Sequence, residues 1–138
     1  MRCYLLVLLA VFLKASICSA ACTAAVITAT LTFVKADAGT PGSSTIATTD
    51  PGAGIARATN TIGKSVKPSV ALNNPATICN AGTCITVSAP TVSPSVATMP
   101  DGNGYVFAYV GGKVTWLAGS PSGVYTGTPI KVTFACTN

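Results

Sequence analysis

The side chains that could carry acid–base chemistry are few in this sequence. The only acids are Asp37, Asp50 and Asp101, and His, Glu and Gln are absent. Without histidine there is no imidazole base and no Ser-His-Asp or Cys-His unit. Each aspartate lies close to Gly or Pro, where Asp commonly stabilises a turn. These residues predict that the chain is not an enzyme and that it holds no cofactor and no metal.

Cysteine is the other reactive residue type. Four cysteines, Cys22, Cys79, Cys84 and Cys136, follow the leader described below, and an even number in an exported protein indicates a disulfide framework. Four cysteines allow three pairings. The turn-forming segment NAGT would bring Cys79 and Cys84 opposite one another, which favours that bridge and leaves Cys22 for Cys136. A zinc site is the alternative, but the spacing lacks paired C-x2-C knuckles.

Aromatic residues gather late in the chain and offer a candidate ligand face. Tyr105, Phe107 and Tyr109 alternate with small or aliphatic residues, so they share one side of a predicted strand. Such a row suits either core packing or stacking against a carbohydrate. We favour core packing, because this cluster is the largest apolar mass that the sequence offers.

The first residues are predicted to be a secretory signal peptide. An apolar run, Leu5–Leu13, follows a basic residue and precedes small residues, which predicts cleavage after Ala20 or Ala21. The run is too short for a membrane anchor, which needs about 20 residues. Lipidation of Cys22 is disfavoured because Ser19 occupies the position of a branched aliphatic residue. We therefore expect a leader at 1–20 and a single exported domain at 21–138, in the periplasm, at the cell surface or outside the cell.

Composition predicts the fold class. Hydrophobic residues make up 49% of the chain and charged residues only 8%. The scarcity of Glu, Gln, Lys and Arg removes most strong helix formers, whereas abundant Thr and Val favour pleated, half-buried surface. The net charge is +5, but the basic residues are scattered singly and form no face that could follow phosphates. We predict an all-β domain that does not bind nucleic acid.

Short strands separated by turns can be placed along the chain. Apolar residues alternate over 25–33, which predicts a half-buried strand. Residues 36–60 are rich in Gly, Thr, Ser and Pro and predict at best a short strand near 45–48. Further β-like runs lie at 69–73, 76–79, 84–88 and 91–99, and the prolines at 68, 75, 90, 94 and 100 are expected at strand ends and in loops. This spacing favours an antiparallel sandwich.

The last third of the chain has the clearest pattern. A strand at 104–110 is expected to turn at Gly111-Gly112 and to return as a strand at 113–119. The final strand begins at Val124, and Pro129 predicts that it is an edge strand or carries a bulge near its start. Its inward face is predicted to hold Ile130, Val132, Phe134 and Cys136.

The segments YVGGKVTWLAG and PSGVYTGTPIKVTFAC resemble the C-terminal half of a bacterial fimbrial-type domain family of unknown function. That family is itself similar to chaperone–usher pilins, including the spore-coat-U-like archaic pilins. The resemblance covers about 35 residues, from Gly104 to Asn138. It rests on a Gly-Gly pair, a small-residue turn and a Gly-x-Tyr-x-Gly segment that leads into an alternating terminal strand.

The resemblance implies an incomplete immunoglobulin-like sandwich in a structural subunit of a surface fibre or coat. The missing strand would come first from a periplasmic chaperone and then, at an outer-membrane usher, from another copy or a related subunit. Ala25–Phe33 alternates well enough to be such a donor strand. A Cys22–Cys136 bridge would tether that segment to its own domain, as in a self-complemented, capped subunit. A secreted glycan-binding module and a stand-alone periplasmic domain are the alternatives.

Overall fold

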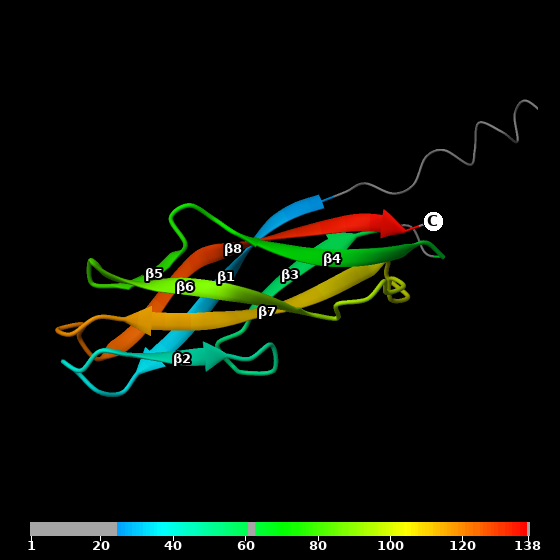
Figure 1. Ribbon diagram of the computed structural model, residues 1–138. Coiled ribbons are helices and arrows are strands. Elements are labelled where there is room, and N and C mark those ends of the chain that lie inside the picture. Colours follow the sequence, from blue (N-terminus) through cyan, green and yellow to red (C-terminus); the bar gives the residue numbers. More distant parts are fainter. Residues whose placement is uncertain (1–24, 61–62, 138) are drawn as a thin grey trace, which may run out of the picture.

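The computed structural model describes residues 25–60 and 63–137, which form one antiparallel sheet curled into a half-barrel (Figure 1). No helix occurs among these residues, so none of the described segments is a helix that could cross a membrane. The prediction of an all-β fold is confirmed. The strands are β1 (Ala25–Lys35), β2 (Gly42–Ile46), β3 (Gly54–Thr59), β4 (Ser65–Leu72), β5 (Thr77–Asn80), β6 (Thr83–Ser93), β7 (Tyr105–Trp116) and β8 (Gly123–Thr137).

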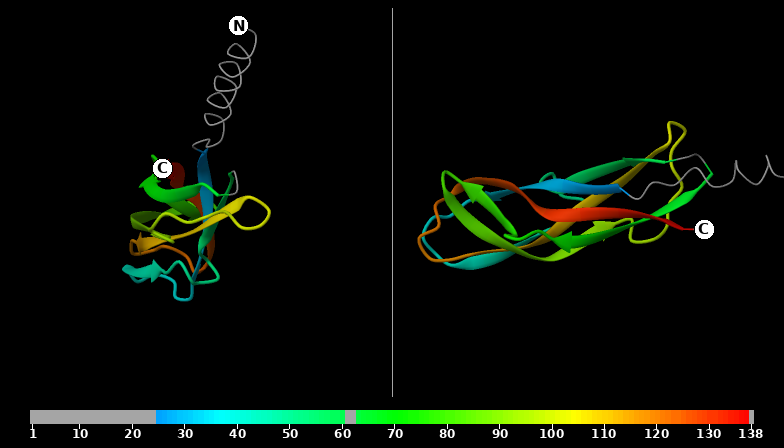
Figure 2. Two further views of the ribbon diagram at one scale, coloured as in Figure 1. Left: turned by 90° about the vertical axis from the view of Figure 1, so that its right-hand side faces the viewer. Right: turned by 90° about the horizontal axis from the view of Figure 1, so that it is seen from above.

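Two long strands, β7 and β8, organise the sheet. β8 pairs with β1 along one side and with β5 and then β4 along the other. β7 pairs with β6 along one side and with β3 and then β2 along the other. The order across the sheet is therefore β1-β8-β5-β6-β7-β2, with β4 beside β8 and β3 beside β7. The strands run along the length of an elongated body (Figure 2).

The curl of the sheet brings its two outer strands, β1 and β3, together along a seam. The amide of Thr32 donates a hydrogen bond of 3.0 Å to the carbonyl oxygen of Gly52. A Cβ atom on Gly54 would lie 2.8 Å from the carbonyl oxygen of Thr30. Glycine at the start of β3 therefore allows a close backbone approach that a side chain would prevent. No continuous ladder joins β1 to β3 within the described residues.

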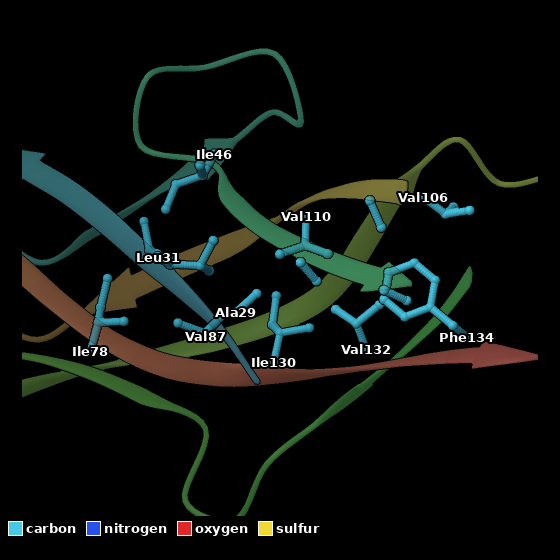
Figure 3. Packing of buried hydrophobic residues seen from close by; sticks show 14 of the residues in the cluster. Ala29, Leu31, Ile46, Ile78, Val87, Val106, Val110, Ile130, Val132 and Phe134 are labelled. Atoms are coloured by element: carbon cyan, nitrogen blue, oxygen red, sulfur yellow. The ribbon is translucent and has the colours of Figure 1, made fainter. Parts of the chain in front are cut away.

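The core fills the inside of this half-barrel (Figure 3). Every second residue of β1 points inward, as the alternation of its sequence predicts, and Ala29 and Leu31 have no exposed surface. The inner face of β8 is equally buried and supplies Ile130, Val132 and Phe134. The rest of the core comes from the other strands: Ile46, Ala56, Ala58, Val66, Ile78, Ile85, Val87, Val106, Ala108, Val110, Val114 and Tyr125.

The predicted hairpin turn at Gly111-Gly112 is wrong, because β7 runs without interruption through both glycines. At this point β7 exchanges one partner for another: Val110 pairs with the first residue of β3, and Gly112 with Ile46 of β2. A Cβ atom on Gly111 would overlap the carbonyl oxygen of Ile46. The glycine pair therefore marks a close crossing of backbones and not a reversal of the chain.

The expectation that prolines mark strand ends and loops is wrong for Pro68, which lies buried inside β4 opposite Phe134. The amide of Val66 points away from β8, since it donates to the carbonyl oxygen of Thr98. Pro68 has the same parity as Val66. Its missing N–H therefore removes no hydrogen bond from the β4–β8 ladder.

Two other prolines lie at bulges. Pro90 lies within β6, where the register with β7 shifts between Ser88 and Thr91. The run predicted at 84–88 and the first residues of the run predicted at 91–99 therefore form one strand, which ends at Ser93. The predicted bulge near Pro129 is confirmed, because the register of β8 against β1 shifts there. β8 is, however, an inner strand and not an edge. The sequence-based prediction also missed β3 entirely.

The disulfide expected from the NAGT segment is present. Cys79 and Cys84 are bonded across the β5–β6 hairpin, with their Cα atoms 4.0 Å apart. The two residues of the turn, Ala81 and Gly82, have φ angles of 46° and 87°, as a type I′ turn requires. Cys136 is also disulfide-bonded. Its predicted partner, Cys22, and the predicted leader lie outside the described residues, so that pairing stays a prediction.

One end of the core is closed by a buried cation. Lys35 continues the inward face of β1 and is 3% exposed. Its ammonium group donates to the carbonyl oxygens of Asp37 and Ser120, and it lies 5.7 Å from the ring of Trp116. These acceptors and the ring replace the water that the charge loses on burial. The same ring stacks on Phe33, so this end of β1 is fixed to β7.

Candidate functional site

The aromatic row of β7 lies on the outside of the half-barrel. Phe107 is 38% exposed and Tyr109 42%, while Tyr105 is half-buried. The alternate residues of the strand, Val106, Ala108 and Val110, are the ones that enter the core. The expectation that the row packs in the core is therefore wrong, because the opposite face of β7 is the one that faces the core. Exposed aromatic groups in a row are unusual on a surface that needs no partner.

Strand β3 completes this outer face, which we call the aromatic face: Ile55, Arg57, Thr59, Tyr105, Phe107 and Tyr109. Pairing in β3 and β7 places Ile55 opposite Tyr109 and Arg57 opposite Phe107. The rings of Tyr105 and Phe107 meet edge to face, with centroids 6.4 Å apart. The guanidinium of Arg57 lies 4.5 Å from the centroid of the Tyr105 ring, within the range of a cation–π contact.

A hollow of about 420 Å³ adjoins the aromatic face at Tyr109. Its apolar wall is formed by Tyr109 and Ile55, together with Pro51 and Ala53. Its polar wall comes from the 48–50 loop and from the end of β6: Thr48, Thr49, Asp50 and Ser93. The hollow thus has one apolar side and one side rich in hydroxyl groups, with a single carboxylate.

Asp50 and Asp101 stabilise turns, as the neighbouring Gly and Pro residues predict. One carboxylate oxygen of Asp50 accepts a hydrogen bond of 2.8 Å from the amide of Ala47. Asp101 accepts from the amides of Asn103 and Tyr105, each at 2.9 Å. No group of three or more Cys, Asp or Glu side chains in the described residues is placed to hold a metal ion.

The surface between β1 and β2 is a second candidate site. A hollow of about 420 Å³ there is lined by Phe33 and Val34 of β1 and by Ser44, Thr45 and Ile46 of β2. Val34 is 67% exposed. Within the described residues no ladder joins β1 to β2, and an unpaired strand edge is a place that a further strand could join.

Sequence analysis missed the contribution of β3 to the aromatic face. The signal was present, because GIARAT alternates small inward residues, Ala56 and Ala58, with the outward side chains of Ile55 and Arg57. It was masked by the surrounding Gly, Thr, Ser and Pro, which favour turns. The predicted ligand residues Tyr105, Phe107 and Tyr109 are brought together on one face, whereas the disulfide Cys79–Cys84 lies in the separate β5–β6 hairpin.

Searches of protein-family models, of curated proteins and of solved structures find no match to this chain. The fold and the two surface features therefore carry the functional argument.

Proposed function

We propose that this chain is a structural subunit of a bacterial surface fibre or coat that assembles by β-strand addition, with a chaperone and an usher as its assembly partners. The observation that carries the proposal is the position of β1. It is the outermost strand of the sheet order and, among the residues that the structure describes, has a ladder only with β8, yet its inward side chains Ala29 and Leu31 are fully buried. A segment of this kind can be supplied by the same chain or by another copy, because the same side chains fill the same pockets.

The strand pairing supports an immunoglobulin-like sandwich as the finer description of the fold. Strands β1, β8 and β4 would form one layer, and β6, β7, β3 and β2 the other. Tyr125, near the start of β8, is fully buried and donates a hydrogen bond of 2.8 Å to the carbonyl oxygen of Pro121. A tyrosine that bonds back to the backbone a few residues upstream is a hallmark of such sandwiches.

The Gly-x-Tyr-x-Gly segment, on which the family resemblance partly rests, has a definite role around this tyrosine. A Cβ atom on Gly123 would lie 2.5 Å from Nδ2 of Asn80, and one on Gly127 would lie 2.9 Å from the carbonyl oxygen of Thr77. Both glycines thus allow β8 to pass close to β5. The two glycines of this segment are thus required for packing against β5, which supports the resemblance beyond the match in sequence.

The predicted Cys22–Cys136 bridge would decide whether β1 can be exchanged. Cys136 lies near the end of β8, beside the start of β1, since Phe134 pairs with Ala25. A bridge there would hold β1 to its own domain and give a self-complemented subunit at the end of a fibre. We therefore expect release of this bridge to favour exchange of β1 between copies.

The test compares the exported mature chain with its Cys136→Ser variant on unheated detergent gels and by light scattering. Strand exchange predicts a ladder of multimers for Cys136→Ser that collapses to monomer on boiling. Excess synthetic peptide of residues 25–35 should cap the growing ends and shorten the ladder. The same peptide with Leu31→Asp should not, because an unpaired carboxylate would enter the core.

A peptide with Val26→Asp is the matched control, since Val26 is on the same strand but 61% exposed; it should cap as well as the unchanged peptide. A Cys136→Ser variant that stays strictly monomeric, like the unchanged chain, would contradict the proposal. A ladder that the unchanged peptide does not shorten would assign assembly to another surface.

A further inference from the structure

We infer that the aromatic face binds an acidic oligosaccharide, with a carboxylate-bearing sugar unit at Arg57 and a neutral unit in the hollow beside Tyr109. This site lies on β3 and β7, whereas the proposed strand exchange uses β1 and β8. The inference therefore does not depend on assembly, and its test can be made on monomeric protein.

The first step is the chemistry of the exposed rings. Phe107 and Tyr109 present their side chains to solvent from successive outward positions of one strand, with Ile55 beside them on β3. Outward neighbours along a strand are about 7 Å apart, so the row offers separate stacking surfaces along one line. Pyranose rings carry apolar C–H faces that stack on aromatic side chains, and their hydroxyl groups stay hydrated at the rim. An extended saccharide can follow such a row.

The second step is the charge of Arg57. Its guanidinium stacks on Tyr105, and within the described residues it has no other partner. Its N–H donors make no hydrogen bond or ion pair within the described residues, and their fork geometry matches a carboxylate. Along the aromatic face no acidic side chain is present to neutralise this charge. Charge complementarity therefore selects a sugar with a carboxylate, such as a uronic acid.

The third step is the polar wall of the hollow. One oxygen of Asp50 is engaged with the amide of Ala47, and the other can accept from sugar hydroxyls. Thr48, Thr49 and Ser93 add hydroxyl groups around it. A second carboxylate would be repelled by Asp50, so this end of the site suits a neutral unit. The two ends of the site thus differ in charge, which gives the saccharide one direction.

The test is calorimetric titration of the mature protein with tetrasaccharides in which a uronic acid alternates with a neutral sugar, such as glucuronic acid with N-acetylglucosamine and glucuronic acid with glucose, and with each after its carboxylates are reduced to alcohols. We expect saturable binding to at least one acidic tetrasaccharide, weakening with salt, and at least tenfold weaker binding after reduction. Arg57→Gln should weaken binding about tenfold or more, and Arg57→Lys by less, because charge survives but the bidentate geometry does not.

Tyr109→Ala tests the other end of the site and should also weaken binding at least tenfold. Lys67→Gln is the matched control, because Lys67 is also an exposed cation, on β4, far from β3 in the sheet order; it should leave affinity unchanged. No binding to any acidic tetrasaccharide, equal binding after reduction, or equal losses in Lys67→Gln would overturn the inference. Concentration-dependent dimerisation abolished by Tyr109→Ala would instead assign the face to a second copy and also overturn it.

Discussion

The ring of Phe33 on β1 stacks on that of Trp116 at the end of β7, with centroids 5.4 Å apart and planes at 28°. Their contact therefore holds β1, the outermost strand in the sheet order, to the inner strand β7, with which it does not pair. The indole N–H of Trp116 also donates to the carbonyl oxygen of Thr40, at 2.9 Å. This one side chain therefore fixes both β1 and the segment that leads into β2.

Removing the stacked ring should loosen β1 more than the rest of the protein. Phe33→Ala is expected to lower the free energy of unfolding by about 2–3 kcal/mol, below the full range for buried aromatics because Phe33 is only partly buried. Hydrogen exchange should show faster opening of the β1 amides than of those in β6. Val34→Ala is the control on the same strand, with a change below about 0.5 kcal/mol because Val34 is exposed.

The glycine pair in β7 gives a second prediction. Gly111→Ala should destabilise the protein by about 1–3 kcal/mol or more, because its Cβ atom would overlap the carbonyl oxygen of Ile46. Gly102→Ala is the matched control, since a Cβ atom there has no neighbour within 4 Å, and it should be neutral or slightly stabilising. Chemical denaturation measures both. Equal stability of the two variants would mean that β7 is not continuous at Gly111.

The turn between β5 and β6 should be open to improvement. Ala81 has a φ angle of 46°, a region that suits Asn and Gly better than Ala. Ala81→Asn creates the Asn-Gly pair preferred in type I′ turns and should stabilise the fold by about 0.5–1 kcal/mol. The thermal midpoint should rise by a few degrees. Ala118→Asn, at an exposed position without positive φ, should not raise it.

The bridge in the same hairpin should contribute moderately to stability. Cys79 and Cys84 are five residues apart, so the loop-entropy model gives the bridge roughly 2 kcal/mol. The double variant Cys79→Ala, Cys84→Ala should therefore unfold at lower denaturant concentration but still cooperatively. Loss of the β circular-dichroism signal in native buffer would show that the short bridge matters far more than this model allows.

The buried tyrosine allows a prediction with a close chemical control. Tyr125→Phe removes only the hydroxyl that donates to Pro121, and should cost about 1–2 kcal/mol. Tyr109→Phe removes a hydroxyl for which the described residues offer no hydrogen-bond partner. Its unfolding free energy should change by less than about 0.5 kcal/mol. Similar losses in both variants would contradict the role assigned to the Tyr125 hydroxyl.

Patterns confined to one strand or turn were predictable from the sequence. The alternation of β1, the inward face of β8 and the Cys79–Cys84 turn depend only on neighbouring residues, and the structure confirms them. The continuation of that alternation to Lys35 was also visible, but burial of a lysine depends on acceptors from distant residues such as Ser120. The local sequence around Lys35 does not indicate where such acceptors lie.

The mistaken predictions share a physical origin. Glycine and proline are common in turns, yet here Gly111 and Pro68 lie inside strands. Gly111 is required because the backbone of β2 passes close to it. Pro68 is tolerated because the amide at its position in β4 would point away from β8. The orientation of the aromatic row was also misjudged, because either parity of β7 contains apolar residues. Small residues such as Ala108 face the core, whereas the rings of Phe107 and Tyr109 lie on the outside. Which face of β7 is buried therefore depends on contacts with strands that are distant in the sequence.

The seam between β1 and β3 has a consequence for how this protein meets others. Natural sheets usually guard their edges with charged gatekeepers, and only 8% of this chain is charged. Here β1 and the segment that leads into β3 lie against each other, and the amide of Thr32 donates a hydrogen bond to the carbonyl oxygen of Gly52. Parting the seam would uncover both edges in a single motion, so orderly joining of copies and uncontrolled aggregation would begin from the same opened form.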